Sequence, residues 1–152
     1  MALPRILRIG QSSSQAIYAR PSLMLVGLIG SVIAGAGLRI AHYLSNRALW
    51  FDEYMLALNI FSRSYTGLLQ PLDHNQGAPL GFLLLEKFSV TVLGPTEVAL
   101  RLFPLLAGLL ALLLFAVLVQ RTTDQPTALM ATVLFAFSYP LLYYSAETKQ
   151  YS

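Results

Sequence analysis

Two adjacent acids, Asp52 and Glu53, follow the first long apolar run of the chain, directly after Trp50 and Phe51. Aromatic side chains of this kind are typical of the boundary between membrane and water. An acid held at that boundary suits a general base, because it can accept a proton from a nearby hydroxyl group. The same acids also suit the first turn of a helix, where they complement the helix dipole. The local sequence leaves both interpretations open.

A second charged pair, Glu86 and Lys87, lies in the middle of the apolar segment 79–93. Neighbouring residues on a helix do not face each other, and the positions three and four residues away carry no opposite charge. Charges that leave water need partners. These would be a metal ion, a ligand phosphate, or one of the residues Arg39, Arg47, Asp52 and Glu53. Alternatively, both side chains extend into water from a helix at the membrane surface.

Four further polar residues are candidates for a site. His74 lies in the turn-rich stretch 73–79 and is a candidate metal ligand, although a single His is more often a surface residue. Arg101 begins the second apolar run, and Glu147 and Lys149 follow the third among several tyrosines. Arg101 could contact lipid phosphate or a structural carbonyl, and lipid phosphate is the default for a residue at the end of a span. The chain end could form a polar wall that faces the same outer site as Asp52; the alternative is an aromatic belt with solvated charges.

Membrane-spanning helices are the elements that must position these residues. The chain has 152 residues, of which 56% are hydrophobic and 11% charged, whereas soluble domains carry about 25% charged residues. Three uncharged runs are long enough, at about 1.5 Å per residue, to cross the hydrocarbon core. We therefore expect an all-α membrane protein with three transmembrane helices, at about residues 21–44, 98–119 and 127–146.

Two shorter helices are expected between the first two spans, at about residues 52–64 and 79–93. The first carries an apolar-aromatic stripe at helical spacing, formed by Tyr54, Leu58, Phe61 and Tyr65. For the second, burying Glu86 and Lys87 at the bilayer centre would cost several kcal/mol. We therefore predict that both helices lie on the membrane surface; a fourth span at 79–93 is the competing interpretation.

Charge predicts the orientation. Arg5, Arg8 and Arg20 precede the first span without an acid, so a tail over residues 1–20 is expected in the cytoplasm and most acids outside, as in a bacterial inner-membrane protein. The first span is longer than a signal-peptide core and more spans follow, so we expect it to be retained. The net charge of +3 is too small and scattered for nucleic-acid binding, and without cysteine there is no disulfide or Cys-based zinc site.

Taken together, these residues resemble the N-terminal part of the integral-membrane GT-C glycosyltransferases. The nearest groups are the protein mannosyltransferases, the rhizobial lipopolysaccharide galacturonosyltransferases and the lipid A aminoarabinose transferases. The resemblance covers about residues 20–152 and is carried by four pieces in order, at residues 49–53, 74–87, 93–104 and 143–151. Members of this family have two juxtamembrane helices between their first two spans, which implies the same arrangement here.

The resemblance implies inverting transfer of a sugar from a polyprenyl-phosphate donor to an acceptor hydroxyl of a glycan, lipid or protein at the extracytoplasmic face. Asp52 matches the catalytic carboxylate of the family, with Glu53 beside it. The pair Glu86 and Lys87 matches an acid–lysine pair that helps to hold metal or lipid phosphate in some members. In the implied reaction Lys87, with Lys149 or Arg101, stabilises the negative charge on the departing lipid phosphate, and Glu147 belongs to the same substrate site. No cofactor is required by this reaction, and a divalent metal is an option.

The resemblance also implies a role for the chain end. Glu147 matches the acid that follows the third span, and Lys149 stands where many relatives carry arginine. Lysine keeps the charge but loses the two-pronged geometry of a guanidinium group. Because members of the family have many more spans, we expect this chain to be an N-terminal fragment or a truncated product that is inactive alone.

Two other classes of function are compatible with the sequence. In a small transporter or membrane subunit, Glu86, Lys87 and Glu147 would form a proton or ion relay, because charges within a membrane commonly mark such pathways. In a purely structural membrane hairpin, the acids at 52 and 53 would have no chemical role.

Overall fold

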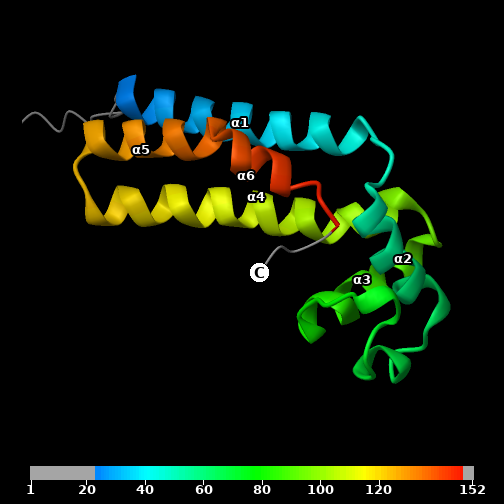
Figure 1. Cartoon of the computed structure of the whole chain (residues 1–152). Helices are drawn as coiled ribbons and strands as arrows, with labels where there is room; N and C mark the ends of the chain where they lie inside the picture. Colours follow the sequence, from blue (N-terminus) through cyan, green and yellow to red (C-terminus); the bar gives the residue numbers. More distant parts are fainter. Residues whose placement is uncertain (1–22, 149–152) are drawn as a thin grey trace, which may run out of the picture.

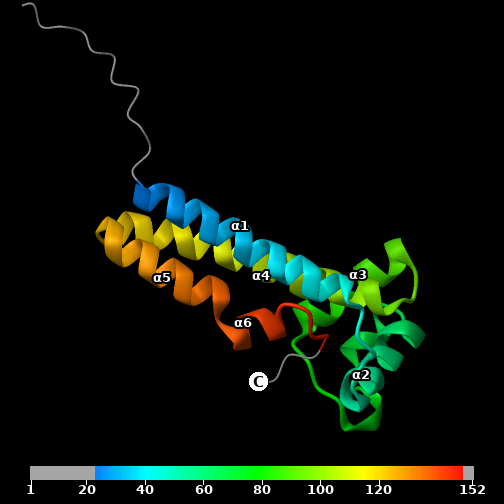
Figure 2. The same ribbon diagram turned by 90° about the horizontal axis from the view of Figure 1, so that it is seen from above.

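The computed structural model describes residues 23–148, and over that range the chain is helical without any β-strand. Three helices form a bundle: α1 (Leu23–Leu44), α4 (Glu97–Thr122) and α5 (Gln125–Phe137). Two more helices, α2 (Phe51–Ser62) and α3 (Leu80–Leu93), form a lobe at one end of the bundle (Figure 1). The last helix, α6 (Tyr139–Tyr144), leads from α5 toward this lobe, and the view in Figure 2 places the lobe beyond the same end.

Within the described part of the chain, α1 and α4 are long and apolar enough to cross a membrane. A core helix of a water-soluble protein would be mostly buried in the protein, but only 17% of the apolar window of α1 and 28% of that of α4 are. Large apolar side chains such as Ile33 and Leu114, which are 66% and 59% exposed, need an apolar surrounding. This exposed apolar surface indicates association with a membrane.

The segment 127–146, expected as a third span, is not one continuous helix. α5 ends at Phe137, the backbone of Ser138 is extended with φ −60° and ψ 116°, and α6 starts at the next residue. Pro140 is the physical reason, because proline has no N–H to offer to the carbonyl group of Ala136 and its ring collides with that carbonyl in a continuous helix. Proline is well tolerated in the first turn of the new helix.

Arg39 of α1 satisfies carbonyl groups at this break. Its Nη1 donates to the carbonyl oxygens of Ala136, at 3.1 Å, and of Gly35, at 2.9 Å. Its Nη2 reaches the carbonyl oxygen of Phe135 at 3.5 Å. The helices approach closely because residue 35 is glycine: a Cβ there would lie 2.8 Å from the Cβ of Ala136. A buried arginine therefore ties the end of α5 to α1.

The two short helices were predicted at 52–64 and 79–93, and α2 and α3 lie within two residues of those bounds. They pack against each other and against the start of α4 through an apolar core that includes Leu56, Ile60, Phe82, Leu83 and Leu100. Tyr54, from the aromatic stripe, is 50% exposed and points away from this core. The buried face of α2 is therefore the one that carries Glu53.

Candidate functional site

Four charged side chains from distant parts of the sequence meet where the lobe joins the bundle. We call this set, Arg47, Glu53, Arg101 and Glu147, the charge cluster. Arg47 lies in the loop after α1, and Glu147 lies just after α6. The side chains of Glu53 and Arg101 approach to 4.0 Å, Arg47 forms an ion pair with Glu147, and Glu147 is hydrogen-bonded to Glu53. Glu53, Arg101 and Glu147 are 0%, 2% and 4% exposed, whereas the side chain of Arg47 is 37% exposed, so three of the four groups are buried and the fourth reaches the surface.

Glu53 connects two segments of backbone. Its Oε2 accepts a hydrogen bond from the N–H of Trp50, at 3.0 Å, which closes the first turn of α2. Its Oε1 accepts from the N–H of Thr148, at 2.7 Å, which holds the segment after α6 against α2. The interpretation of this acid as a helix cap is therefore confirmed, with a long-range contact added to it.

Glu147 shares its environment with a second acid. Burial of its carboxyl group, and then the hydrogen bond to Glu53, raise the pKa of Glu147 to about 7, although Arg47 opposes the shift. Two carboxyl groups in hydrogen-bond contact require a proton between them, because two carboxylates repel each other. Around neutral pH Glu147 therefore gains or loses its proton readily.

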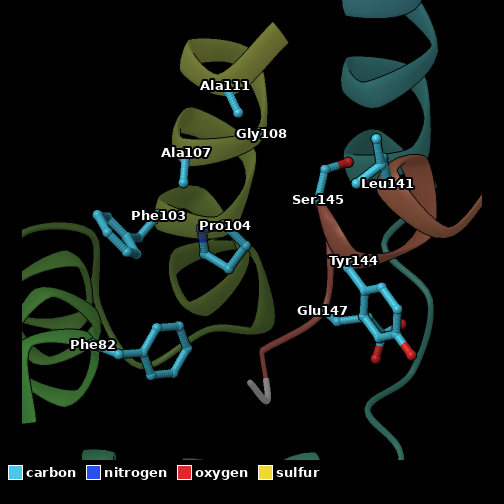
Figure 3. A pocket seen from close by; sticks show the side chains of 10 residues that line it. All are labelled: Phe82, Phe103, Pro104, Ala107, Gly108, Ala111, Leu141, Tyr144, Ser145 and Glu147. Carbon is cyan, nitrogen blue, oxygen red and sulfur yellow. The ribbon is translucent and has the colours of Figure 1, made fainter. Parts of the chain in front are cut away.

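A cleft of about 480 Å³ opens beside the charge cluster, between α3, α4 and α6 (Figure 3). One wall is apolar and belongs to α3 and α4, with Phe82, Phe103, Pro104, Ala107 and Ala111. Across from it lie Leu141, Tyr144, Ser145 and Glu147. An apolar hollow with a few polar groups at one side suits a ligand with an apolar body and a polar head. Among the four charged groups of the cluster, Glu147 is the one that lines the cleft.

Arg101 is buried with donors left over. Its Nε and Nη2 have no hydrogen-bond partner among the described residues. Buried N–H groups of a guanidinium are costly when they are unsatisfied. They are well suited to an anion such as phosphate, which guanidinium groups bind strongly. The predicted phosphate-binding role of Arg101 is thus compatible with its geometry.

Asp52 and Lys87 lie outside the charge cluster. Asp52 is exposed at the start of α2 and does not line the cleft. Lys87 lies at the other end of that helix, where its Nζ donates to the carbonyl oxygen of Ile60, at 2.8 Å, and reaches that of Phe61 at 3.4 Å. A cation is favourable there because the last carbonyl groups of a helix have no partners within it. The two ends of α2 are about 10 Å or more apart, so the expected pocket shared by the two charged pairs is not formed.

Glu86 is enclosed without a polar partner. It is 0% exposed, and neither carboxyl oxygen has a hydrogen-bond partner within residues 23–148. Burial raises the pKa of Glu86 to about 9, so the group is protonated and neutral at pH 7. The expectations that it pairs with a charge or extends into water are both wrong, because loss of its proton would leave an unpaired charge inside the lobe.

The predicted metal ligands are not brought together. His74 is exposed on the short helix η2 (Asp73–Asn75), whereas Glu86 is enclosed in α3. Over the described range, no three side chains among His, Asp and Glu gather in a way that could hold a metal ion. Lys149 and the tail over residues 1–20 lie outside the described residues.

Replacing Glu86 with leucine should stabilise the protein at alkaline pH. The folded-state pKa of about 9 lies above the ordinary value of 4.5, so the folded state binds more protons between these limits and the free energy of unfolding falls as pH rises. Glu86→Leu should remove this fall and gain about 1–3 kcal/mol at about pH 8. The measurement is the thermal midpoint in detergent at about pH 6 and about pH 8. Glu97→Gln, at the start of α4, is the control, and an equal pH response in both variants would contradict the assignment.

Sequence reasoning did not place two contributors to the site. Arg47 was considered only as a distant partner for Glu86 or Lys87, and Thr148 was not considered. The signal for Arg47 was its position in a short loop, three residues before Trp50. Nothing local marks Thr148, because its contribution is a backbone N–H.

Comparison of the chain with protein-family models, with curated proteins and with solved structures finds no match. Over the described range, the chain is all-helical and has two helices that are long and apolar enough to span a membrane. Its distinguishing feature is a largely buried charge cluster at the polar side of an apolar cleft.

Proposed function

We propose that the chain is the N-terminal part of a GT-C-type glycosyltransferase of the bacterial inner membrane. The reaction is transfer of a sugar from a polyprenyl-phosphate donor to an acceptor hydroxyl at the extracytoplasmic face. The observation that carries the proposal is the charge cluster beside the cleft. A donor of this kind needs apolar space for its prenyl chain and polar groups for its head. The cleft offers the apolar space with Glu147 at its wall, and Arg101 of the charge cluster has hydrogen-bond donors to spare for a phosphate.

The proposal requires three passages through the membrane, with α2 and α3 on its outer surface. α1 and α4 are each long enough to cross alone. The third passage would be made by α5 and α6 together, since 13 and 6 helical residues cover about 28 Å at 1.5 Å each, close to the hydrocarbon thickness of about 30 Å. The charge cluster, at the lobe end of the bundle, would then lie at the membrane–water boundary. A charged donor head cannot cross hydrocarbon cheaply, which favours chemistry on one face.

In the proposed reaction, the acceptor oxygen forms a bond to the anomeric carbon of the donor sugar. The bond from that carbon to the phosphate oxygen breaks, and its electron pair leaves with the lipid phosphate. The family resemblance implies that the acceptor proton passes to the carboxylate of Asp52. Asp52 lies outside the cleft, and Glu147 is the acid that lines it. The unsatisfied donors of Arg101 stabilise the charge that develops on the phosphate.

The remaining predicted residues take supporting roles. Glu53 positions the start of α2 and the chain after α6, since its carboxylate oxygens accept backbone N–H groups from both. Glu147 lines the cleft and would accept a hydrogen bond from a substrate hydroxyl. Lys149 remains a candidate for phosphate binding, whereas Lys87 stabilises the end of α2.

A photoreactive analogue of undecaprenyl phosphate tests the proposal in proteoliposomes that contain the whole chain. Label should appear in α4 and in residues 139–148, and undecaprenyl phosphate should compete for it more strongly than undecaprenol, which lacks the charge. Ala107→Trp, which fills the cleft, should reduce labelling at least about tenfold, a loss of about 1.4 kcal/mol in binding. Leu106→Trp is the matched control, because Leu106 is 53% exposed and does not line the cleft. Equal labelling of the two variants, or equal competition by the alcohol, would refute the proposal.

The transport alternative lacks a specific observation in its favour. Among the described residues Glu86 has no hydrogen-bond partner, and Lys87 donates to backbone carbonyl groups of α2. A relay through these groups and Glu147 would need polar contacts from one to the next.

A further inference from the structure

A second hollow, of about 410 Å³, adjoins the cleft through a shared wall residue, Tyr144. Its lining comes from the loop after α1 and from α6, and we call it the aromatic recess: Arg47, Trp50, Tyr139, Pro140, Tyr143 and Tyr144. The side chains of Trp50, Tyr139 and Tyr144 are 59%, 73% and 53% exposed. More than half of each of these three aromatic side chains is therefore exposed.

Arg47 holds the recess in shape. Its guanidinium carbon lies 5.7 Å from the centre of the Trp50 ring and 5.0 Å from that of the Tyr143 ring. Its Nη2 donates to the hydroxyl oxygen of Tyr143 at 3.2 Å and is also paired with Glu147. The Tyr143 ring in turn contacts the rings of Tyr139 and Tyr144, at centre-to-centre distances of 5.9 and 5.4 Å. These aromatic groups are thus preorganised around one fixed guanidinium.

From this geometry we infer that the aromatic recess binds the pyranose ring of a saccharide, which, if the proposed function holds, is the sugar-transfer acceptor. A pyranose has apolar C–H faces, which pack on the negative faces of aromatic rings. Its edge carries hydroxyl groups, which find hydrogen-bonding partners in tyrosine hydroxyls and a guanidinium. A volume of 410 Å³ falls in the range of small-molecule sites.

Continuity with the cleft also favours a substrate. The ion pair from Arg47 to Glu147 joins the aromatic recess to the charge cluster, and Tyr144 separates the recess from the cleft that Glu147 lines, so a saccharide seated in the recess would lie beside the cleft. Tyrosine and tryptophan at a membrane boundary also anchor lipid headgroups. An aromatic belt is spread around the helices, whereas here two rings from different segments lie against one guanidinium, and two more rings pack on the ring of Tyr143.

Trp50 is the single tryptophan of the chain and reports directly on the recess. The whole chain, purified in phosphatidylcholine nanodiscs, is titrated with cellobiose, whose β-linked rings have flat C–H faces on both sides. Its indole emission should change saturably, with half-saturation at about 1–10 mM. Sorbitol, an open-chain polyol, should cause no saturable change. If the two compounds behave alike, the inference is wrong.

Two tyrosine variants locate the binding. Tyr139→Ala should raise the half-saturation concentration of cellobiose at least fivefold, a change of about 1 kcal/mol. Tyr65→Ala is the control, because Tyr65 is 42% exposed in the loop after α2 and does not line the recess. Thermal midpoints establish that both variants are folded. An unchanged value in Tyr139→Ala would overturn the inference.

The result is separable from that of the donor experiment. An emission change with phosphatidylglycerol in the nanodisc, but none with cellobiose, would assign the recess to lipid headgroups and overturn the inference. Saccharide binding without undecaprenyl phosphate labelling would uphold the recess and refute the glycosyltransferase. Labelling without saccharide binding would overturn the recess alone.

Discussion

Replacing Glu53 with alanine should lower the free energy of unfolding by about 3–5 kcal/mol, since removing one member of a buried charge pair leaves the other uncompensated. The variant would leave buried Arg101 without its nearby acid and the N–H groups of Trp50 and Thr148 without their acceptor. Asp52→Ala is the matched control, because Asp52 is the exposed neighbour on the same helical turn. The measurement is the thermal midpoint in detergent, and similar midpoints for the two variants would contradict the structural role of Glu53.

If Glu53→Ala does not accumulate, Glu53→Gln gives a second test. The amide keeps one oxygen acceptor but cannot take the negative charge that, with its hydrogen bond, helps to raise the pKa of Glu147 to about 7. The pKa of Glu147 should therefore fall toward its ordinary value of 4.5, and the loss of stability as pH rises through 7 should weaken. Infrared titration of the carboxyl band, compared with Glu147→Gln, measures this pKa. A titration identical to that of the unchanged chain would mean that the two acids do not interact.

Arg39→Met should destabilise the bundle by about 2–4 kcal/mol, because backbone carbonyl groups without partners are costly away from water. Methionine keeps an unbranched apolar stem but removes the donors that satisfy the carbonyl oxygens of Ala136 and Gly35. Arg121→Met, at the exposed end of α4, is the control and should change stability by less than about 0.5 kcal/mol. Thermal midpoints of both variants in the same detergent decide the point. A loss of equal size in both would show that the effect is general to arginine removal.

The Arg39 and Glu53 variants test the two ends of one segment, the chain that runs from α5 through α6 to Thr148. Arg39 ties the end of α5 to α1, and α6 follows directly from that point. A Cβ at Gly108 would lie 2.7 Å from the Cβ of Ser145, so glycine allows the end of α6 to lie against α4. Glu53 then holds Thr148, the next described segment, against α2. The cleft and the aromatic recess both use α6 as a wall, so their shapes depend on these contacts.

The helices themselves follow from local sequence. The uncharged runs predicted α1 and α4. The segments with acids near their start or middle predicted α2 and α3. These four helices begin and end within a few residues of the predicted bounds. The break before α6 has a local cause in Pro140, but a proline alone does not predict it, because Pro104 lies inside α4 without ending that helix. The capping role of Glu53 was readable, because an acid in a first turn acts on its own helix.

The tertiary structure alone determines the partner of each charged side chain. Glu53 binds a backbone group 95 residues away, Arg47 pairs with an acid 100 residues away, and Lys87 meets carbonyl groups of α2 where a phosphate or an acid had been expected. Helix formation depends on hydrogen bonds and periodicity within a few residues. The partners of a buried charge depend on which helices pack together, and packing depends on the shape of whole faces, such as the contact of Gly35 with Ala136.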